Sequence, residues 1–197
     1  MVALLGLLYI SAISFAQHNP PSSHEMQGSG ELTYADSINS GLIPADTMNG
    51  SVHRVAMQTI GDCHMHIEYN SPGVRVRGIW GELVPYDKVW VTGAHKATSI
   101  TITKAIRMGG KDIPAGRYAI FTIPGTGSWT FIINKNPDQH QADNYKQSED
   151  EVRLTVKPLA HPITQRLTYE IRQKKKNRGE ILMNWELLSI AVPFEVK

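Results

Sequence analysis

Cysteine is almost absent from this chain, which has a single one among its 197 residues. One thiol cannot form an internal disulfide, so a hydrophobic core has to supply the stability of the fold. The lone Cys63 fits three roles: a small buried apolar group, a metal ligand or a free thiol. Burial is the commonest fate of an unpaired cysteine.

Positive charge is missing from the N-terminal quarter. No lysine or arginine precedes Arg54, although acidic residues such as Asp36 and Asp46 lie there. The formal net charge of +2 is too small to indicate a nucleic-acid-binding protein. Basic residues gather in the run Lys174-Lys175-Lys176-Asn177-Arg178, which we predict to be the solvated tip of a hairpin.

The motifs of several common enzyme classes are also missing. There is no Gly-X-Ser-X-Gly elbow that would expose a serine nucleophile. There is no glycine-rich loop of the Walker or dinucleotide-binding type, because Gly109-Gly110 fits a hairpin turn with no helix after it. These absences favour a protein that is not an enzyme, and they do not identify a reaction class.

A long apolar run occurs at the start of the chain, in residues 1–16 (MVALLGLLYISAISFA). Its apolar part is too short to span a bilayer comfortably. It ends in small residues, which is typical of a secretory signal peptide cleaved before Gln17, although no basic residue precedes it. We therefore expect an exported protein, periplasmic or extracellular, with no transmembrane segment in the mature chain.

Composition divides the rest of the chain into a leader and a domain. Residues 17–50 are rich in serine, proline, glycine, asparagine and aspartate, which predicts a flexible leader that packs loosely on the domain. The folded domain is expected to cover residues 51–197, a length that fits a single core.

Turn residues recur about every 8–12 positions in this domain, and no long helical period appears, which is typical of a sandwich or barrel. Val52–Ile60 and Cys63–Tyr69 should form a hairpin around Gly61-Asp62. Further strands are predicted at 88–92, 99–103, 118–123, 129–133, 152–156, 167–171, 181–185 and 190–196. The expected fold is all-β, an antiparallel β-sandwich or a partly closed barrel of about 8–10 strands.

Several stretches of the domain are similar, in order, to one bacterial family. They are YNSPGV, IWGELVPYDKVWVTGAHKATSI, IPAGRYAIFTIPG, SWTFIINKN, DEVRLTVKP and QRLTYEI. On these motifs the chain from about Ser51 to its end resembles the DUF2911 family of exported proteins, a domain of unknown function. The resemblance implies an exported all-β domain with an unassigned site and transfers no catalytic role. The sequence departs from the family pattern at Val76 and Glu82, where glycine is usual, and at His95, where asparagine is common.

Alternation along residues 63–69 separates two kinds of side chain. Successive residues of a strand point to opposite faces, so Cys63 and Met65 should face the core, while His64 and His66 share the other face. This arrangement argues against a copper site that combines the cysteine with these histidines.

Histidines form the first candidate site. His64 and His66 are spaced to reach one metal ion, and His95 or His140 would be the third ligand. Imidazole ligands suit zinc or copper among other ions. The alternatives are that His64 and His66 are exposed on a solvent face, or that they form hydrogen bonds in a pocket without metal.

Aromatic residues form the second candidate site. Trp80, Tyr86 and Trp90 could present a platform for a sugar ring or another flat ligand. The alternative is that they plug one end of the sandwich core. Trp129 and Trp185 fall inside predicted strands and are expected in the core.

Charged residues complete the candidate ligand pocket. Arg75 and Arg77 flank Val76 and would share a strand face, where they could hold a carboxylate or phosphate as a fork. The alternative is that they pair with Glu68 or Glu82. Either glutamate is also a candidate general base.

Three functional hypotheses follow. The first is an exported ligand-binding β domain, with a small-molecule or carbohydrate ligand at residues 69–98 and a histidine-bound metal as an optional part. The second is a metal-dependent hydrolase or redox enzyme that uses His64, His66 and His95. The third is an envelope structural or interaction protein without a small-molecule site.

The signal-peptide hypothesis is tested by the mature N-terminus. When the full chain is expressed in a bacterium with an outer membrane, the secreted or periplasmic form should begin at Gln17. Mass spectrometry of the intact protein checks this result. Full-length protein retained in the cytoplasmic fraction would contradict the hypothesis.

Overall fold

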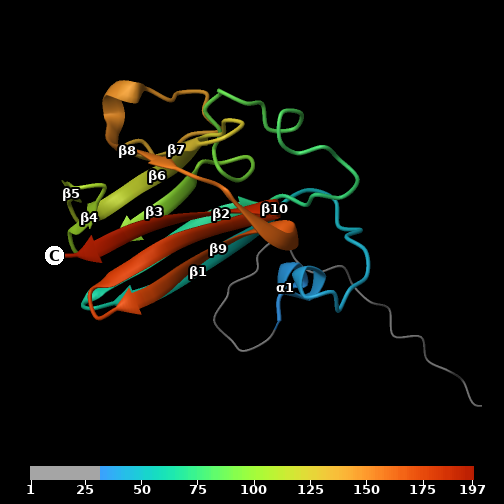
Figure 1. Ribbon diagram of the computed structural model, residues 1–197, viewed down its shortest axis with the longest axis horizontal. Coiled ribbons are helices and arrows are strands. Elements are labelled where there is room, and N and C mark those ends of the chain that lie inside the picture. Colours follow the sequence, from blue (N-terminus) through green and yellow to red (C-terminus); the bar gives the residue numbers. More distant parts are fainter. Residues whose placement is uncertain (1–31) are drawn as a thin grey trace, which may run out of the picture.

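The computed structural model describes residues 32–197, which form two open antiparallel β-sheets with little helix (Figure 1). Its elements are α1 (Tyr34–Asn39), β1 (Val52–Ile60), β2 (Cys63–Ser71), β3 (Thr98–Ile102), β4 (Ile106–Met108), β5 (Lys111–Ile113), β6 (Gly116–Ile123), β7 (Trp129–Asn134), η1 (Gln147–Glu149), β8 (Asp150–Val156), β9 (Leu159–Lys175) and β10 (Arg178–Val196). The expected all-β sandwich is confirmed.

In this part of the chain no helix has the length and hydropathy needed to cross a membrane. The expected signal peptide lies outside the described residues.

The larger sheet has the strand order β1-β2-β3-β6-β7-β8. β1 and β2 form the predicted hairpin, with Val52 opposite Ser71 and Ile60 opposite Cys63. β6 is a central strand, and its residues from Tyr118 to Thr122 are buried because both faces of the sheet are covered here.

The smaller sheet has the order β5-β4-β10-β9 and depends on two long strands. The sequence predicted three short strands in this part, at 167–171, 181–185 and 190–196, whereas β9 and β10 extend over 17 and 19 residues. Register shifts between Asn184 and Leu188 are bulges that bend the pair without ending it. The turn between the two strands carries the basic run, and its residues are exposed, as predicted.

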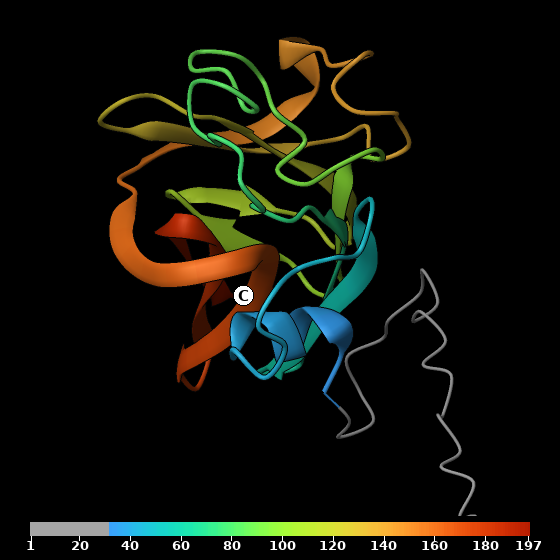
Figure 2. The ribbon, with the colours of Figure 1, turned by 90° about the vertical axis from the view of Figure 1, so that its right-hand side faces the viewer.

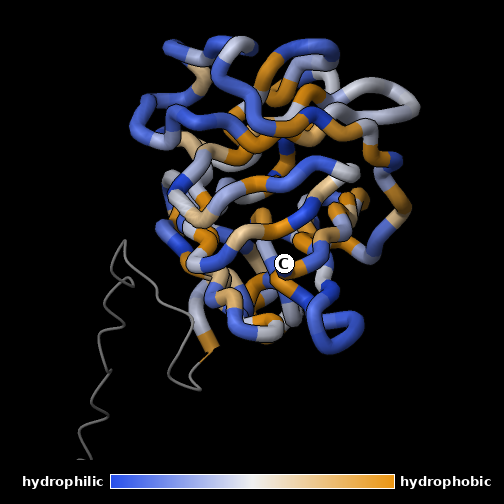
Figure 3. Tube along the Cα trace, turned by 90° about the vertical axis from the view of Figure 1, so that its left-hand side faces the viewer, coloured by the Kyte–Doolittle hydropathy of each residue, from blue (hydrophilic) through white to orange (hydrophobic). Residues whose placement is uncertain are grey.

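The core lies between the two sheets and takes alternate residues of their strands. Along β2, Cys63, Met65 and Ile67 are fully buried, while His64 and His66 lie on the opposite face, as the alternation predicted. Hydrophobic and hydrophilic residues accordingly alternate along the Cα trace (Figure 3). Cys63 is therefore a buried apolar group of the core.

Two long connections, residues 72–97 and 135–149, lie over the outer face of the larger sheet (Figure 2). Apolar side chains from both pack on Ala119, Phe121 and Ile132 and form a second, smaller cluster. The strand expected at 88–92 is absent, and a single bridge joins Trp90 to Thr122 instead. The chain cannot extend further because Asp87 and Thr92 on either side have φ values of 57° and 52°, in the left-handed region.

Residues 32–50, from the expected leader, pack on the sandwich. Thr33 and Asp36 form a reciprocal capping box that begins α1, and Ile38 of this helix is buried. Asp36 also forms an ion pair of 2.7 Å with the buried Arg54. Burial opposes the ionisation of Asp36, but hydrogen bonds from Thr33 and the charge of Arg54 hold the pKa of its carboxyl below the usual value.

A second ion pair fixes the end of this segment. The guanidinium of Arg166 lies 2.7 Å from a carboxylate oxygen of Asp46, and the side chains are 0% and 3% exposed. Arg166 also donates hydrogen bonds to the carbonyl oxygens of Met48, Ser71 and Gly50. A Cβ at Gly73 would lie 2.2 Å from the Asp46 carboxylate, so glycine is required for this approach.

Asp46→Asn removes the charge that balances Arg166 and should lower the free energy of unfolding by about 3 kcal/mol, because a buried cation is left uncompensated. Urea denaturation followed by tryptophan fluorescence measures this change. Glu170→Gln, which breaks an exposed pair with Arg172, is the matched control and should leave the midpoint nearly unchanged. Equal effects of the two variants would contradict the role assigned to Asp46.

Candidate functional site

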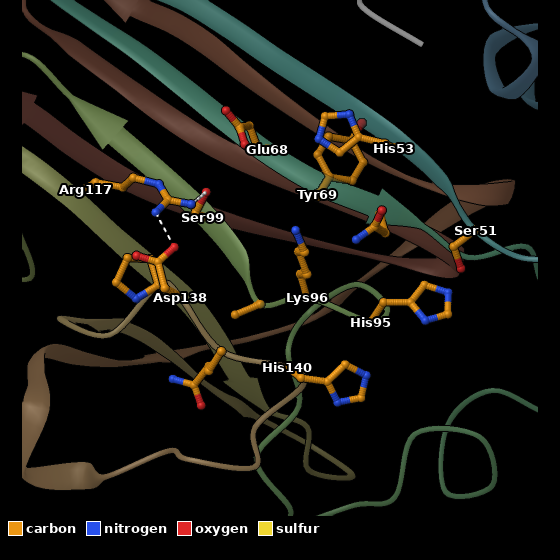
Figure 4. A pocket seen from close by; sticks show the side chains of 14 residues that line it. Ser51, His53, Glu68, Tyr69, His95, Lys96, Ser99, Arg117, Asp138 and His140 are labelled. Carbon is orange, nitrogen blue, oxygen red and sulfur yellow. Dashed lines mark hydrogen bonds and ion pairs between the residues drawn. The ribbon is translucent and has the colours of Figure 1, made fainter. Parts of the chain in front are cut away.

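A cleft of about 750 Å³ lies on the outer face of the larger sheet, beside the region that the two connections cover (Figure 4). Its floor includes Glu68 of β2, Ser99 of β3 and Arg117 of β6. Residues 95–97 and 137–140 form its walls. The cleft therefore joins strands of the sandwich to loops that are distant in sequence.

Strand register explains the floor. Glu68 lies opposite Ser99 in the β2–β3 pair, and both point away from the core because their neighbours Ile67 and Ile100 point into it. At the end of β2, the amide of Asn70 donates a 2.9 Å hydrogen bond to the carbonyl oxygen of Ala94. This contact holds the 95–97 wall against the floor.

The two walls are joined through their backbones. Lys96 forms a bridge with His140, and the Gln141 N–H donates to the His95 carbonyl oxygen at 2.5 Å. His95 and Gln141 have φ values of 63° and 48°. Histidine is one of the few residue types besides glycine that adopt this left-handed region with some frequency. The side chain of His95 is thereby held at the rim of the cleft.

Charges in the cleft are partly compensated. Arg117 pairs with Asp138 at 2.6 Å, and His140 lies 3.0 Å from Asp143. Lys96, by contrast, has no carboxylate within ion-pair distance among residues 32–197, and it extends from its loop toward β2 (Figure 4). The cleft thus offers hydrogen-bond donors and acceptors, with one uncompensated ammonium group.

Comparison with known families identifies the family of this chain. A family model described as a protein of unknown function (DUF2911) matches residues 51–194. The chain belongs to the DUF2911 family. No curated protein and no solved structure matches it. The chemistry of this DUF2911 domain therefore has to be argued from its own side chains.

The histidines proposed as metal ligands do not converge in this DUF2911 domain. His64 contacts Thr59 at 3.1 Å, and His66 lies 3.6 Å from Glu68. His95 lies near Asn70 instead, which is six residues beyond His64 on β2, a separation of roughly 20 Å along a strand. One ion cannot reach both ends. Across residues 32–197 no group of three or more His, Cys, Asp or Glu side chains could hold a metal ion, so zinc or copper binding stays a prediction from sequence.

The tryptophans form one cluster, in which Trp80 and Trp90 are half-buried against the core rather than presented as an exposed platform. The Trp80 ring lies 4.7 Å from that of Trp129 and 5.8 Å from that of Trp90, and Trp90 stacks on Trp185 at 5.6 Å. Trp129 and Trp185 are buried, as predicted. Tyr86 lies against the backbone of Gly81. The geometry matches the alternative hypothesis, in which Trp80 and Trp90 plug one end of the sandwich.

Arg75, Arg77 and Trp90 line a second cleft of about 330 Å³, which borders the first at Ser51 and His95. The arginines lie in a turn and not on the strand that the sequence suggested, yet both reach this cleft. Neither pairs with Glu68, which lines the first cleft. Nor do they pair with Glu82, whose carboxyl group packs over Gly78.

Sequence reasoning missed several residues of the first cleft, namely His53, Lys96, Ser99, Arg117 and Asp138. A signal was available for the residues on strands. Ser99 lies in the polar phase of the strand predicted at 99–103, whereas Arg117 lies one residue before the strand predicted at 118–123 and was not assigned to it. Residues on the same outer face meet only when the strand order is known, and the sequence does not give that order.

Proposed function

We propose that this DUF2911 domain binds a small polar ligand in the cleft formed by the β2–β3–β6 floor and the two loops. The proposal rests on one observation: hydrogen-bonding side chains from five separate parts of the chain converge on a single concave surface. They are Ser51, Glu68, Lys96, Arg117 and Asp138. Concave sites with convergent polar groups are the usual form of small-molecule sites.

The uncompensated ammonium of Lys96 favours binding over a merely solvated surface. A single exposed lysine is ordinary. Here, however, its loop is fixed by the Asn70 side chain and by the bridge to His140, so the ammonium is presented toward the cleft. A ligand acceptor at this position would gain a charge-assisted hydrogen bond.

Recognition in this cleft would depend on hydrogen bonds and charge rather than on stacking. No tryptophan lines this cleft among the described residues, and its Tyr69 has only 1% of its surface exposed. A carbohydrate therefore remains compatible through its hydroxyl groups, but not through a ring platform. The hydrolase alternative is weaker because the loop of His95 contacts β2 at Asn70, six residues beyond His64.

Export completes the proposal. The apolar run at residues 1–16, which ends in small residues, supports it. We propose that the domain meets its ligand in the periplasm or outside the cell.

A ligand screen by NMR tests the cleft. ¹⁵N-labelled protein is titrated with millimolar neutral sugars, sugar acids and small dicarboxylates. At least one compound should shift the backbone amides of residues 95–97 and 138–141 together, and Lys96→Ala should weaken its affinity about tenfold because a charge-assisted hydrogen bond is lost.

Lys104→Ala is the control, since Lys104 lies in an exposed pair with Asp62 and does not line the cleft. It should leave the affinity unchanged. If no compound shifts the cleft amides, or if both lysine variants bind equally, the cleft is not the binding site.

A further inference from the structure

The second cleft has a charge that its own lining does not balance. Arg75 and Arg77 both contribute to it, and its lining residues include no aspartate or glutamate. Every other arginine in the chain forms an ion pair with a carboxylate, at positions 54, 107, 117, 153, 166, 172 and 178. Within residues 32–197, Arg75 and Arg77 are the exceptions.

Both guanidinium groups are held in place by neutral backbone acceptors instead. Arg75 donates to the carbonyl oxygen of Met48, and Arg77 donates to those of Gly73 and Val74. These bonds orient the groups without cancelling their charge. Val76 between them is fully exposed, so the turn presents its two charged neighbours to the cleft and its apolar side chain to solvent.

Two buried donors at this cleft also have no hydrogen-bond partner among the described residues. They are Nε of Arg75 and the indole nitrogen of Trp185. A buried donor without an acceptor is costly, and native proteins seldom leave one. Since both unsatisfied groups are donors, the missing partner has to be an acceptor. Arg75 is also held at a φ of 53°, in the left-handed region, a kind of strain that gathers at binding sites.

We propose that this arginine cleft binds an oxyanion group, a carboxylate or a phosphate, of the ligand whose polar body lies in the first cleft. The two clefts share Ser51 and His95, so one molecule can occupy both. The ligand class is then an acidic small molecule, such as a sugar acid or a sugar phosphate. This inference rests on the proposed function for the position of the ligand body, but the oxyanion site stands on its own residues.

Phosphate alone tests the oxyanion site. Sodium phosphate and sodium acetate are titrated at constant ionic strength against a chloride blank, and tryptophan fluorescence reports binding because Trp90 and Trp185 line the cleft. One of the anions should give a saturable change. Arg77→Gln should weaken it at least about tenfold by removing a charged donor. Arg172→Gln, an exposed arginine on the other sheet, should not.

Arg75→Gln should have the same effect as Arg77→Gln. Because Arg75 also holds the Met48 carbonyl, its fold is checked by near-UV circular dichroism, and Arg77→Gln carries the test if the Arg75 variant unfolds. A linear response to both anions that is equal in wild type, Arg77→Gln and Arg172→Gln overturns the oxyanion site.

Glucose 6-phosphate, glucuronate and glucose separate this inference from the proposed function. Tighter binding of either acid than of its bare anion, lost in Lys96→Ala as well as in Arg77→Gln, supports one ligand across both clefts. Equal binding of the acid and the bare anion keeps the oxyanion site and overturns the shared ligand. Binding of glucose that is unaffected by Arg77→Gln keeps the first cleft and overturns the acidic ligand class.

Discussion

The buried guanidinium of Arg166 joins the N-terminal segment and the end of β2 to the smaller sheet. A cation with no solvent exposure is costly to bury unless a carboxylate and several acceptors surround it. Asp46 supplies the carboxylate, and the backbone at positions 48, 50 and 71 supplies carbonyl oxygens. These partners belong to the N-terminal segment and to the end of β2. The side chain of Arg166 on β9 therefore holds both the N-terminal segment and the end of β2 in place.

The ion pair of Arg166 and Asp46 is connected to the arginine cleft through the backbone of Met48. The Met48 carbonyl that accepts from Arg166 also accepts from Arg75, so the buried ion pair and the arginine cleft share an atom. On the other side, β9 pairs with the start of the 72–97 connection through Gly73 and Val74. The sandwich thus supplies the fixed register, and the loops carry several of the groups that we propose to contact a ligand, an arrangement common in binding proteins.

Local patterns predicted local structure well and predicted the site poorly. Strict alternation placed Cys63 in the core and His64 outside it, and Gly61-Asp62 marked the first hairpin. The composition of residues 17–50 predicted only a leader and missed α1, which begins at a capping box formed by Thr33 and Asp36. The packing of this N-terminal segment depends on the ion pair between Asp46 and Arg166. The two residues are 120 positions apart, so no local pattern predicts their contact. Likewise, the spacing of His64 and His66 says nothing about where His95 lies, because that depends on the Asn70–Ala94 contact.

We propose that the two adjoining clefts form one site for an acidic ligand, anchored at Arg75 and Arg77. A crystal structure of the protein soaked in selenate tests this anchor, because selenate has the shape of sulfate and its selenium can be located by anomalous scattering. We expect an anomalous peak within hydrogen-bond distance of both guanidinium groups. Selenate confined to the basic hairpin tip at residues 174–178, with an empty arginine cleft, would contradict it.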